Sequence, residues 1–574
     1  MRQVKLKKIL VNIWRLTTAL DRRKLGIVSI LVLLMTLIES IGVISIMPFL
    51  AVLASPQTIE TNVLVSKIYL FISPETKRDF IIYLGLISLT IVIFSATIKV
   101  ITLYYLNRFS SLQRHYFATR LLNIYLKQNY IFFVQRNSSE LIKIILSDLD
   151  QVVWGVIRPI LLIMSYSCVI FAMIGILIFY DPIMAISTAF IISSFYLIIY
   201  VIVRRLMLKI SQEHSQANTE RYQSCNEVFG GIKDVIINNA KNSYLERFNK
   251  NSRVFSRHLA TQESLGQIPL YIIETIGYGC LIILAIYLVI LDQEVSTILP
   301  ILGLYGVAAY RMLPAAQIIY RSFATLKFSE HILDKVVAEF DLNSSELNQD
   351  NVDYNLEFNT IIELRNVSFA YSNHLERKVI KNFSLTIDKD TSVGIIGKSG
   401  SGKSTLMDIM LGLLQPSDGN LIIDGQIIDH HNVKSWQKLI SYVPQNIYLA
   451  DTSIAENIAF GIPYEEIDIN RIYEAAKMAY IHDFIIGNLE NGYNTLIGER
   501  GVMLSGGQRQ RLGIARALYK KPKVLFMDEA TSALDIETEK AVNDAIQALN
   551  GKLTIIIIAH RQSAIAHCNQ IISL

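Results

Sequence analysis

The sequence predicts a multidomain chain in which an all-α domain of six transmembrane helices precedes an α/β domain with a phosphate-binding P-loop. The first half contains six apolar stretches long enough to cross a bilayer, whereas the second half alternates short β-type runs with helical segments. A glycine-rich segment, 397–405, stands between a strand-like run and a helix-like run. The predicted boundaries are 1–335 for the transmembrane domain, 336–357 for a polar linker and 358–574 for the α/β domain.

The composition excludes several classes of protein. Of the 574 residues, 52% are hydrophobic and 18% are charged, against about 25% charged residues in soluble globular chains. This excludes an ordinary soluble enzyme, a disordered chain and a fibrous protein. The net charge of +5 is small for this length and gives no reason to expect nucleic acid as a partner. Four widely spaced cysteines lack metal-ligand spacing and fit soluble parts that face a reducing cytosol.

The apolar stretches and the basic residues between them predict a topology. A helix needs about 20 apolar residues to cross a bilayer, and the stretches that qualify are roughly 25–53, 80–98, 159–180, 183–203, 267–291 and 295–318. Eight basic residues precede residue 25, six lie in 107–151 and ten in 204–265. Because basic loops stay in the cytoplasm, we expect a multi-pass protein with both termini and the α/β domain in the cytoplasm.

The two long basic loops are mostly helical in pattern, which indicates that the spans continue beyond the bilayer. Near the middle of these loops lie Asn137–Gln151 and Phe229–Asn239. One interpretation is a solvated helical hairpin. The other is that each hairpin tip docks onto a cytoplasmic partner, for which the second half of the chain is a candidate.

The glycine-rich segment has the composition of a P-loop. Its backbone N–H groups can surround phosphate oxygens, and the helix that follows adds its positive end. Lys403 can reach the β- and γ-phosphates, and Ser404 can ligate Mg²⁺. The sequence therefore predicts ATP binding, with Mg²⁺, by Gly397, Lys398, Ser399, Gly400, Ser401, Gly402, Lys403, Ser404 and Thr405.

Two further segments carry related chemistry. The apolar run Val524–Met527 delivers Asp528 and Glu529 at the carboxyl end of a predicted strand, where ligands gather in open α/β sheets. One carboxylate can hold Mg²⁺ through water, while the other can polarise an attacking water. The second segment, Leu504–Gln508, opens a helix and forms another anion-binding surface. One active site needs one P-loop, so the second surface requires an explanation.

These motifs, in this order, resemble the nucleotide-binding domain of an ABC (ATP-binding cassette) transporter. By this resemblance Tyr371 is similar to the aromatic residue that stacks on adenine. Gln445 is similar to the Q-loop glutamine, which touches Mg²⁺ and contacts the membrane domain. Asp528 matches the Walker B aspartate that serves Mg²⁺, Glu529 the general base and His560 the switch histidine near the γ-phosphate.

The resemblance also explains the second anion-binding surface. Gly498–Gly501 resembles the X-loop of exporters, and Ser532–Asp535 resembles the D-loop. In ABC proteins the signature of one subunit completes the ATP site of the other. The resemblance therefore implies a homodimer with two equivalent ATP sites and twelve spans. The residues that would act in trans are Ser505, Gly506, Gly507, Gln508 and Asp535.

Six spans fused before the ATPase domain resemble ABC exporters rather than importers. This implies alternating access driven by ATP, with the two hairpin tips as coupling helices. Ionisable residues inside spans are functional candidates, and Arg311 and Glu274 lie about 24 and 27 Å below the outer ends of their spans. Either these two residues pair across helices, or Arg311 faces the cavity and meets an anionic head group. Lys99 is expected to snorkel at the inner interface, and Glu39 has no assigned role.

The segments Ile38–Phe49 and Tyr310–Pro314 resemble the PglK-type bacterial flippases for lipid-linked oligosaccharides. This implies ATP-driven export or flipping of a lipid-linked oligosaccharide, or a related amphipathic glycolipid, across the bacterial inner (cytoplasmic) membrane, with membrane lipids as partners. One alternative is an ABC exporter of peptide, drug or lipid A. Another is an ATP-gated channel or regulatory membrane subunit, against which the intact Glu529, His560 and signature argue.

Overall fold

The computed structural model divides the chain into two compact units. A helical unit comprises Met1–Lys127 and Arg136–Asn343, and an α/β unit comprises Gln128–Gln135 and Ser344–Leu574. The structure describes residues 6–54, 56–61, 63–180, 182–290, 295–342, 356–371, 378–398, 400–498, 501–529, 540, 544, 547–549, 551–559 and 565–574.

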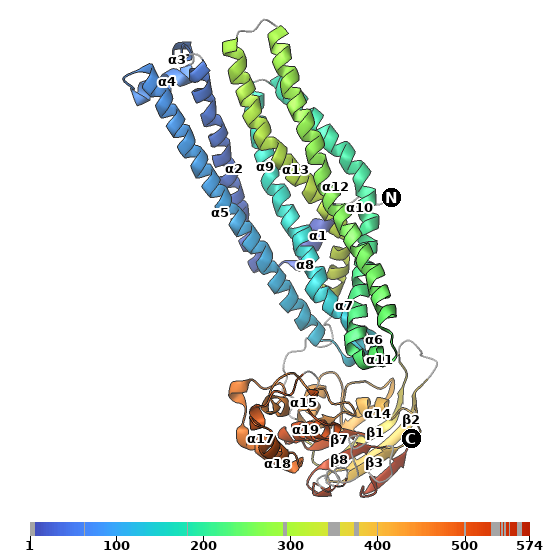
Figure 1. Ribbon diagram of the computed structural model, residues 1–574. Coiled ribbons are helices and arrows are strands. Elements are labelled where there is room, and N and C mark those ends of the chain that lie inside the picture. The colour runs from blue at the N-terminus through green and yellow to red at the C-terminus, as the bar shows by residue number, and fades with distance from the viewer. Residues whose placement is uncertain are drawn as a thin grey trace. The chain divides into compact units, whose positions relative to one another are not determined.

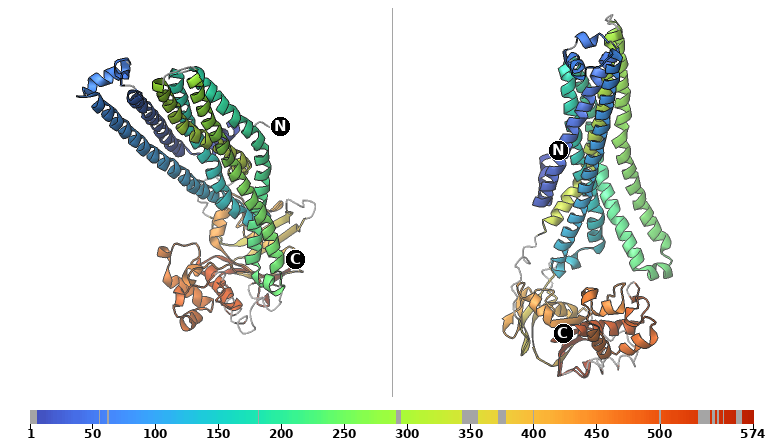
Figure 2. Two further views of the ribbon diagram at one scale, coloured as in Figure 1. Left: turned by 45° about the horizontal axis from the view of Figure 1, so that its top comes forward. Right: turned by 90° about the vertical axis from the view of Figure 1, so that its left-hand side faces the viewer.

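Long helices dominate the helical unit (Figure 1). They are α1 (Leu6–Leu16), α2 (Ala19–Ala54), α3 (Thr58–Thr61), α4 (Val63–Ile72), α5 (Lys77–Leu126), α7 (Ser138–Lys143), α8 (Leu149–Val152), α9 (Arg158–Tyr180), α10 (Pro182–Gly230), α11 (Ile232–Ile237), α12 (Lys241–Ile290) and α13 (Val295–Phe340). Two π-helical turns, Ile144–Asp148 and Val153–Ile157, flank α8. Helix α2 packs along α5, and α10 packs along α12 (Figure 2).

Each predicted span lies within one of these helices as far as the structure describes it. Three helical stretches of the described residues are long and apolar enough to cross a membrane, namely Asp21–Leu53, Lys77–Leu126 and Ser138–Ile178. At 1.5 Å per residue the 50 residues of α5 extend about 75 Å, well beyond a hydrocarbon core of about 30 Å. Its N-terminus is fixed by Thr76, whose side chain accepts the Asp79 N–H.

The last helix is longer than the sequence predicted. Helix α13 continues to Phe340, so the first residues of the predicted linker 336–357 are helical. The physical reason is packing, because Val336 is buried and the buried Glu339 accepts hydrogen bonds from Tyr125 and Arg136. At the other end of the predicted linker, Leu356 belongs to the core of the α/β unit.

The α/β unit is built on two sheets (Figure 1). A parallel sheet has the strand order β6-β7-β8-β3-β9, and an antiparallel sheet has the order β2-β1-β4-β5. The strands are β1 (Ile361–Phe369), β2 (Ile380–Asp388), β3 (Ser392–Ile396), β4 (Asp418–Ile423), β5 (Gln426–Ile427), β6 (Ile440–Val443), β7 (Val524–Asp528), β8 (Thr554–Ile558) and β9 (Gln570–Ser573). The helices are α6 (Tyr130–Gln135), α14 (Lys403–Met410), α15 (Val433–Leu439), α16 (Ile454–Ile458), α17 (Ile469–Met478), α18 (His482–Asn488) and α19 (Gly506–Tyr519).

Side-chain alternation on the parallel strands creates two separate cores. Val524 and Phe526 of β7 point into the core that contains α14 and the antiparallel sheet. Leu525 and Met527 point into the other core, which contains α16, α17, α18 and α19. Strand β8 alternates in the same way. Because successive side chains of a strand face opposite sides, α14 and α19 cover opposite faces of the sheet.

The hairpin tip that joins the α/β unit is not the one expected. Helix α6 belongs to that unit, and Ile131 packs on the core that contains α14. The predicted tip Asn137–Gln151 begins just after α6 and lies in the helical unit, where Lys143 and Asp148 are fully buried and paired at 2.9 Å. The expectation for this first tip is therefore wrong by about two turns of helix. Residues Ile232–Ile237 of the second tip form α11 of the helical unit.

A histidine lies near this buried pair, outside the predicted spans. The His214 ring stacks on Phe255 at 4.3 Å and meets the edge of Phe328 at 5.1 Å. Neither ring nitrogen has a hydrogen-bond partner among the described residues. Burial, together with the nearby His258, Lys143 and Arg221, lowers the pKa of His214 to about 4.

We predict that His214→Phe removes an acid-sensitive component of stability. A histidine with a lowered native pKa stabilises the fold fully above its unfolded pKa of about 6.5, and this stability falls as the pH drops toward 4. The shift corresponds to at most about 3 kcal/mol. Thermal unfolding between pH 8 and pH 4.5 should show a smaller loss for His214→Phe than for wild type. The exposed His115, changed to Phe, is the control, and an equal loss in all three proteins would contradict the assignment.

Candidate functional site

The P-loop lies between β3 and α14 as a cradle of backbone groups. Gly400 and Gly402 have φ of +81° and +100°, values that side-chain-bearing residues rarely adopt. A Cβ on Gly402 would lie 3.2 Å from the Val379 carbonyl oxygen. Lys403 begins α14, is buried, and donates to the carbonyls of Gly397 at 2.8 Å and Lys398 at 3.1 Å. The Lys403 ammonium group therefore links the two ends of the P-loop through these two hydrogen bonds.

Two features of the cradle fit a bound phosphate group with Mg²⁺. The buried Ser401 hydroxyl has no hydrogen-bond partner among the described residues, and an anion at the start of α14 would provide one. Ser404, the predicted Mg²⁺ ligand, is exposed in the first turn of α14. Tyr371 lies beside this turn, with its hydroxyl 3.3 Å from Thr405 Oγ1. Ser399 lies outside the described residues.

The two predicted carboxylates lie at the carboxyl end of strand β7 in the parallel sheet. Asp528 is the last residue of β7, and Glu529 follows it with φ of +47°. This left-handed backbone is strained for a residue other than glycine. It is held by a hydrogen bond from the Glu529 N–H to the Ile558 carbonyl at 2.9 Å. The Gln445 side chain donates to Glu529 Oε2 at 2.7 Å, so the structure brings the predicted Q-loop glutamine and general base into contact.

Sequence reasoning missed two residues at this edge. Tyr442 of β6 donates a hydrogen bond to Asp528, and burial raises the pKa of Tyr442. Burial, with the Asp528 carboxylate adding to it, raises the pKa of Asp408 to about 6. Asp408 stands one helical turn after Ser404, and this i, i+4 spacing was the signal that could have pointed to it.

The signature segment forms a capping box at the start of α19. Ser505 Oγ accepts the Gln508 N–H at 3.2 Å, and Gln508 Oε1 accepts the Ser505 N–H at 2.8 Å. Gly506 and Gly507 are the first two residues of α19, so no side chain covers the backbone at its start. The neighbouring side chains of Val502 and Met503 are more than two-thirds exposed. Asp535 and His560 lie outside the described residues, as do Glu499 and Arg500 of the predicted X-loop.

The predicted pairing of Arg311 with Glu274 is wrong. Arg311 Nη1 lies 2.9 Å from Glu39 Oε1, whereas Glu274 accepts a 3.5 Å hydrogen bond from Tyr278 on its own helix. Lys99 also contacts Glu39 Oε1, at 3.3 Å, instead of simply snorkelling. The reason is that α2 packs against both α5 and α13, so its carboxylate lies between the two cations.

The second alternative, that Arg311 faces a cavity and meets an anionic head group, stays a prediction. A cavity of about 450 Å³ lies among α9, α10 and α13, and its walls are largely apolar. Met312 and Leu313 line it, with Tyr196, Tyr200 and Tyr320 among its aromatic residues, but Arg311 is not part of its wall. The Arg311 side chain instead points toward α2, from a different face of the α13 turn that carries Met312 and Leu313.

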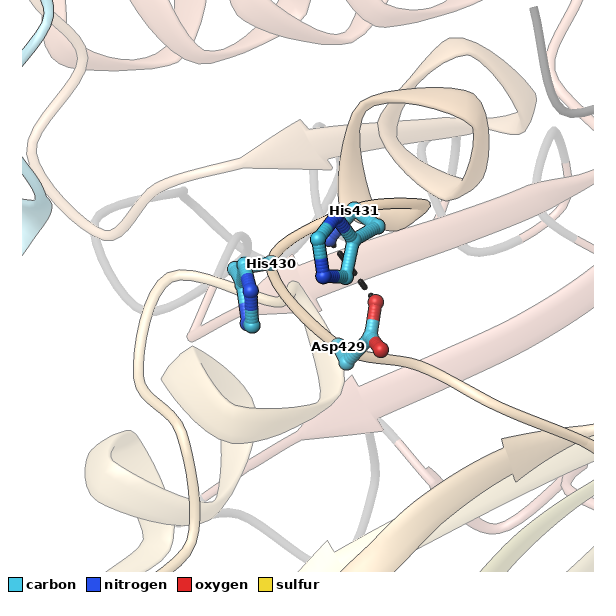
Figure 3. A group of neighbouring side chains, drawn as sticks. All are labelled: Asp429, His430 and His431. Atoms are coloured by element: carbon cyan, nitrogen blue, oxygen red, sulfur yellow. Dashed lines mark hydrogen bonds between the residues drawn. The ribbon is translucent and has the colours of Figure 1, made fainter. Parts of the chain in front are cut away.

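Asp429, His430 and His431 form the one group of metal-ligand type found in the described part of the chain (Figure 3). Their ligand atoms lie within 4.8 Å of one another, but the residues are consecutive in the turn before α15. Asp429 Oδ1 already accepts the N–H groups of His431 and Asn432. This carboxylate therefore acts in the turn, and we assign the group no metal.

The fold and the site together define a P-loop nucleotide-binding domain fused to transmembrane helices. The profile of the ABC transporter transmembrane region matches residues 23–300, and the ABC transporter profile matches residues 380–532. The ATP-dependent lipid A-core flippase of Photorhabdus laumondii is 30% identical over 448 residues, which are 77% of this chain and 75% of that protein. The chain belongs to the ABC transporter family.

Other similarities are partial or structural. ABC transporter B family member 17 of Arabidopsis thaliana is 46% identical over 213 residues, which are 37% of this chain but only 17% of that protein. The structure of a bacterial Atm1-family ABC exporter with ATP bound superimposes with a TM-score of 0.77. The match covers 97% of this chain and 94% of that one at 21% identity, and so shows a shared fold.

We predict that Gly402→Ala weakens ATP binding at least tenfold. A loss of this size corresponds to the binding free energy of about one charge-assisted hydrogen bond to the phosphates. The new Cβ would press on the Val379 carbonyl and displace the loop, and the left-handed backbone would cost about 1–2 kcal/mol. Gly425→Ala is the matched control because Gly425 has φ of +84° and open space around its Cβ position. Equilibrium binding of a fluorescent ATP analogue measures the effect. Equal affinities in both variants would contradict the cradle geometry.

Proposed function

We propose that this chain is a half-transporter that forms a homodimer and uses ATP hydrolysis to export or flip an amphipathic, lipid-linked substrate. The observation that carries the proposal is the position of α6, which follows the second predicted span and yet belongs to the α/β unit. Ile131 packs on the core around α14. Burial raises the pKa of the neighbouring Tyr130, and the charge of Asp408 also raises this pKa. A segment of the membrane part is thereby joined to the helix that starts at the P-loop.

The residues at the sheet edge have roles that follow from their chemistry. The P-loop backbone, Lys403 and Ser404 hold the phosphates, and Tyr371 packs on the base. Bound Mg²⁺, held by Ser404, Gln445 and Asp528, would neutralise phosphate charge. Glu529 takes the proton of the attacking water, and Gln445 contacts it directly. In this proposal His560 assists at the γ-phosphate.

The dimer is supported by the separation of the two anion-binding helices. The P-loop helix and the signature helix cover opposite faces of one sheet, so one nucleotide cannot readily use both from the same chain. The exposed Val502 and Met503 beside the signature are typical of a surface that a partner covers. In the homodimer, Ser505, Gly506, Gly507, Gln508 and Asp535 of one chain complete the site of the other.

The substrate class rests on two similarities of different strength. The segments around Pro48 and Arg311 favour a lipid-linked oligosaccharide, and the lipid A-core flippase relative favours a lipid A-type glycolipid. Both are amphipathic glycolipids of bacterial flippases, and we propose the bacterial inner (cytoplasmic) membrane as the location. Peptide or drug export and an ATP-gated channel remain as rivals for the experiment to separate.

We predict that Glu529→Gln retains ATP binding and reduces hydrolysis at least 100-fold, the typical lower contribution of a general base. Inside-out proteoliposomes with a fluorescent lipid-linked oligosaccharide, a lipid A analogue, a peptide or a drug should show ATP-dependent movement of a glycolipid by wild type only. The exposed Glu490, changed to Gln, is the control. Movement of peptide or drug alone would overturn the substrate class, and ATP-gated ion flux that persists in Glu529→Gln would favour the channel.

A further inference from the structure

A pocket with basic walls lies in the α/β unit, separate from the P-loop. Its volume is about 480 Å³, within the range of about 300–1,000 Å³ that is typical of small-molecule sites. Side chains of α15, the start of α17 and the end of α19 form most of its wall (Figure 1). Among the described residues that line it, four are basic and none is acidic. We call it the basic pocket, and its four cations are Lys434, Lys438, Arg471 and Lys520.

The rotation of α15 directs two lysines into this wall. Trp436 is fully buried, and its Nε1–H donates to the Met410 carbonyl at 2.8 Å. Lys434 and Lys438 stand two residues before and after Trp436, about 200° around the helix from it, so both lysines are exposed. The Gln437 side chain, also in the wall, donates to the carbonyl of the residue that follows α14 at 3.3 Å. Helix α15 is therefore fixed at the end of α14 that is remote from the P-loop.

Arg471 is held in the wall by an aromatic ring. Its guanidinium carbon lies 4.9 Å from the centre of the Tyr519 ring, and Tyr519 is itself buried. The Tyr519 hydroxyl accepts the Asp468 N–H at 3.2 Å, and the Asp468 carboxylate accepts the Arg471 N–H at 3.2 Å. The buried Nε of Arg471 has no hydrogen-bond partner among the described residues. Stacking on Tyr519 therefore places the guanidinium.

Helix dipoles account for only two of the four cations. Lys438 lies in the last turn of α15, and Lys520 is the C-cap of α19, positions at which a cation is favoured. Lys434 and Arg471 lie instead in the first turns of α15 and α17, where the helix dipole disfavours a cation. The positions of these two residues therefore require another explanation.

The positive charge of the pocket attracts anions. Lys434, Arg471 and Lys520 make no ion pair within the described part of the chain. By contrast, the adjacent Lys521 pairs with Glu474 at 3.4 Å. A concave surface lined by one sign of charge concentrates ions of the other sign. The fork of a guanidinium matches two phosphate oxygens at once, and each lysine adds a point charge.

We propose that the basic pocket binds a ligand with two or more phosphate groups, either a soluble molecule or a lipid headgroup. Four cations balance the charge of such a ligand, whereas a single phosphate leaves the pocket positive. The site goes beyond the proposed function, because it lies at the far ends of the two anion-binding helices. The eight residues of α14 and the 14 of α19 extend about 12 and 21 Å. The ligand therefore does not occupy the nucleotide site.

The test is equilibrium binding of tripolyphosphate to the full-length detergent-solubilised protein by isothermal titration calorimetry, without nucleotide or Mg²⁺. All proteins carry Lys403→Ala, which removes the P-loop lysine. Lys434→Met and Arg471→Met should each weaken binding about tenfold, which corresponds to one charge-assisted hydrogen bond. The matched control is Lys521→Met, which removes the same charge from a residue paired with Glu474 and should keep the affinity within twofold.

A second arm separates the two sources of the phosphate groups. Detergent micelles that contain cardiolipin, a lipid with two phosphate groups, are added as competitor, and micelles with phosphatidylglycerol at equal total phosphate are the control. Displacement of tripolyphosphate by cardiolipin alone assigns the pocket to a lipid headgroup. Tripolyphosphate binding that both lipids leave intact assigns it to a soluble molecule.

Three results would overturn the proposal. The first is equal affinity in the pocket variants and the Lys521→Met control. The second is tripolyphosphate binding no tighter than that of inorganic sulfate, and the third is binding of polyglutamate in place of tripolyphosphate, which would assign the pocket to a protein partner. If Arg471→Met does not fold, the exposed Lys434→Met and Lys520→Met still decide the question. Because neither transport nor ATP hydrolysis is measured, failure of the proposed function would leave this result unchanged.

Discussion

The alternation of side chains along β7 and β8 is the constraint on which the nucleotide-binding chemistry depends. It sends Val524 and Phe526 to one core and Leu525 and Met527 to the other, so α14 and α19 are fixed on opposite faces of one sheet. Each helix begins with an anion-binding turn of its own, one built on glycines at positive φ and the other on a capping box. In the proposed homodimer, each chain therefore offers two half-sites.

A second constraint acts in the helical unit, where a buried carboxylate needs partners. Glu39 meets Lys99 and Arg311 because α2 contacts both α5 and α13. Further along the chain, the buried Lys143–Asp148 pair fixes the helical segment after α6. The α6 helix itself joins the α/β unit. In the proposed function this segment, with a buried charge pair on the helical side and apolar packing of Ile131 in the α/β unit, transmits movement between membrane helices and nucleotide site.

The sequence predicted the fold class well because its signals are local. Strand runs such as Ser392–Ile396 and Val524–Met527 stand in the structure with nearly the same bounds. The family assignment from the motifs is confirmed by the comparisons. The roles of individual site residues stay predictions, including those of Ser399, Asp535 and His560, which lie outside the described residues. The PglK-type substrate also stays a prediction.

The errors concern contacts between distant segments. Depth along a helix placed Arg311 and Glu274 at one level, but the pattern of one helix does not reveal which neighbour its side chain faces. The tip Asn137–Gln151 was misplaced because burial of Lys143 depends on the surrounding helices and not on local composition. Asp408 was missed because its raised pKa arises from burial beside Asp528, at the end of a strand 120 residues away in sequence.

The central claim is that two chains share each nucleotide site, and mixed dimers test it most directly. On a Glu529→Gln background, chains with Lys403→Ala and chains with Ser505→Arg are co-expressed with different tags and purified as pairs. The account predicts one retained ATP per mixed pair and none in either homodimer, because one intact P-loop then faces one intact signature. No retained ATP in the mixed pair, or full retention by a monomer, would contradict it.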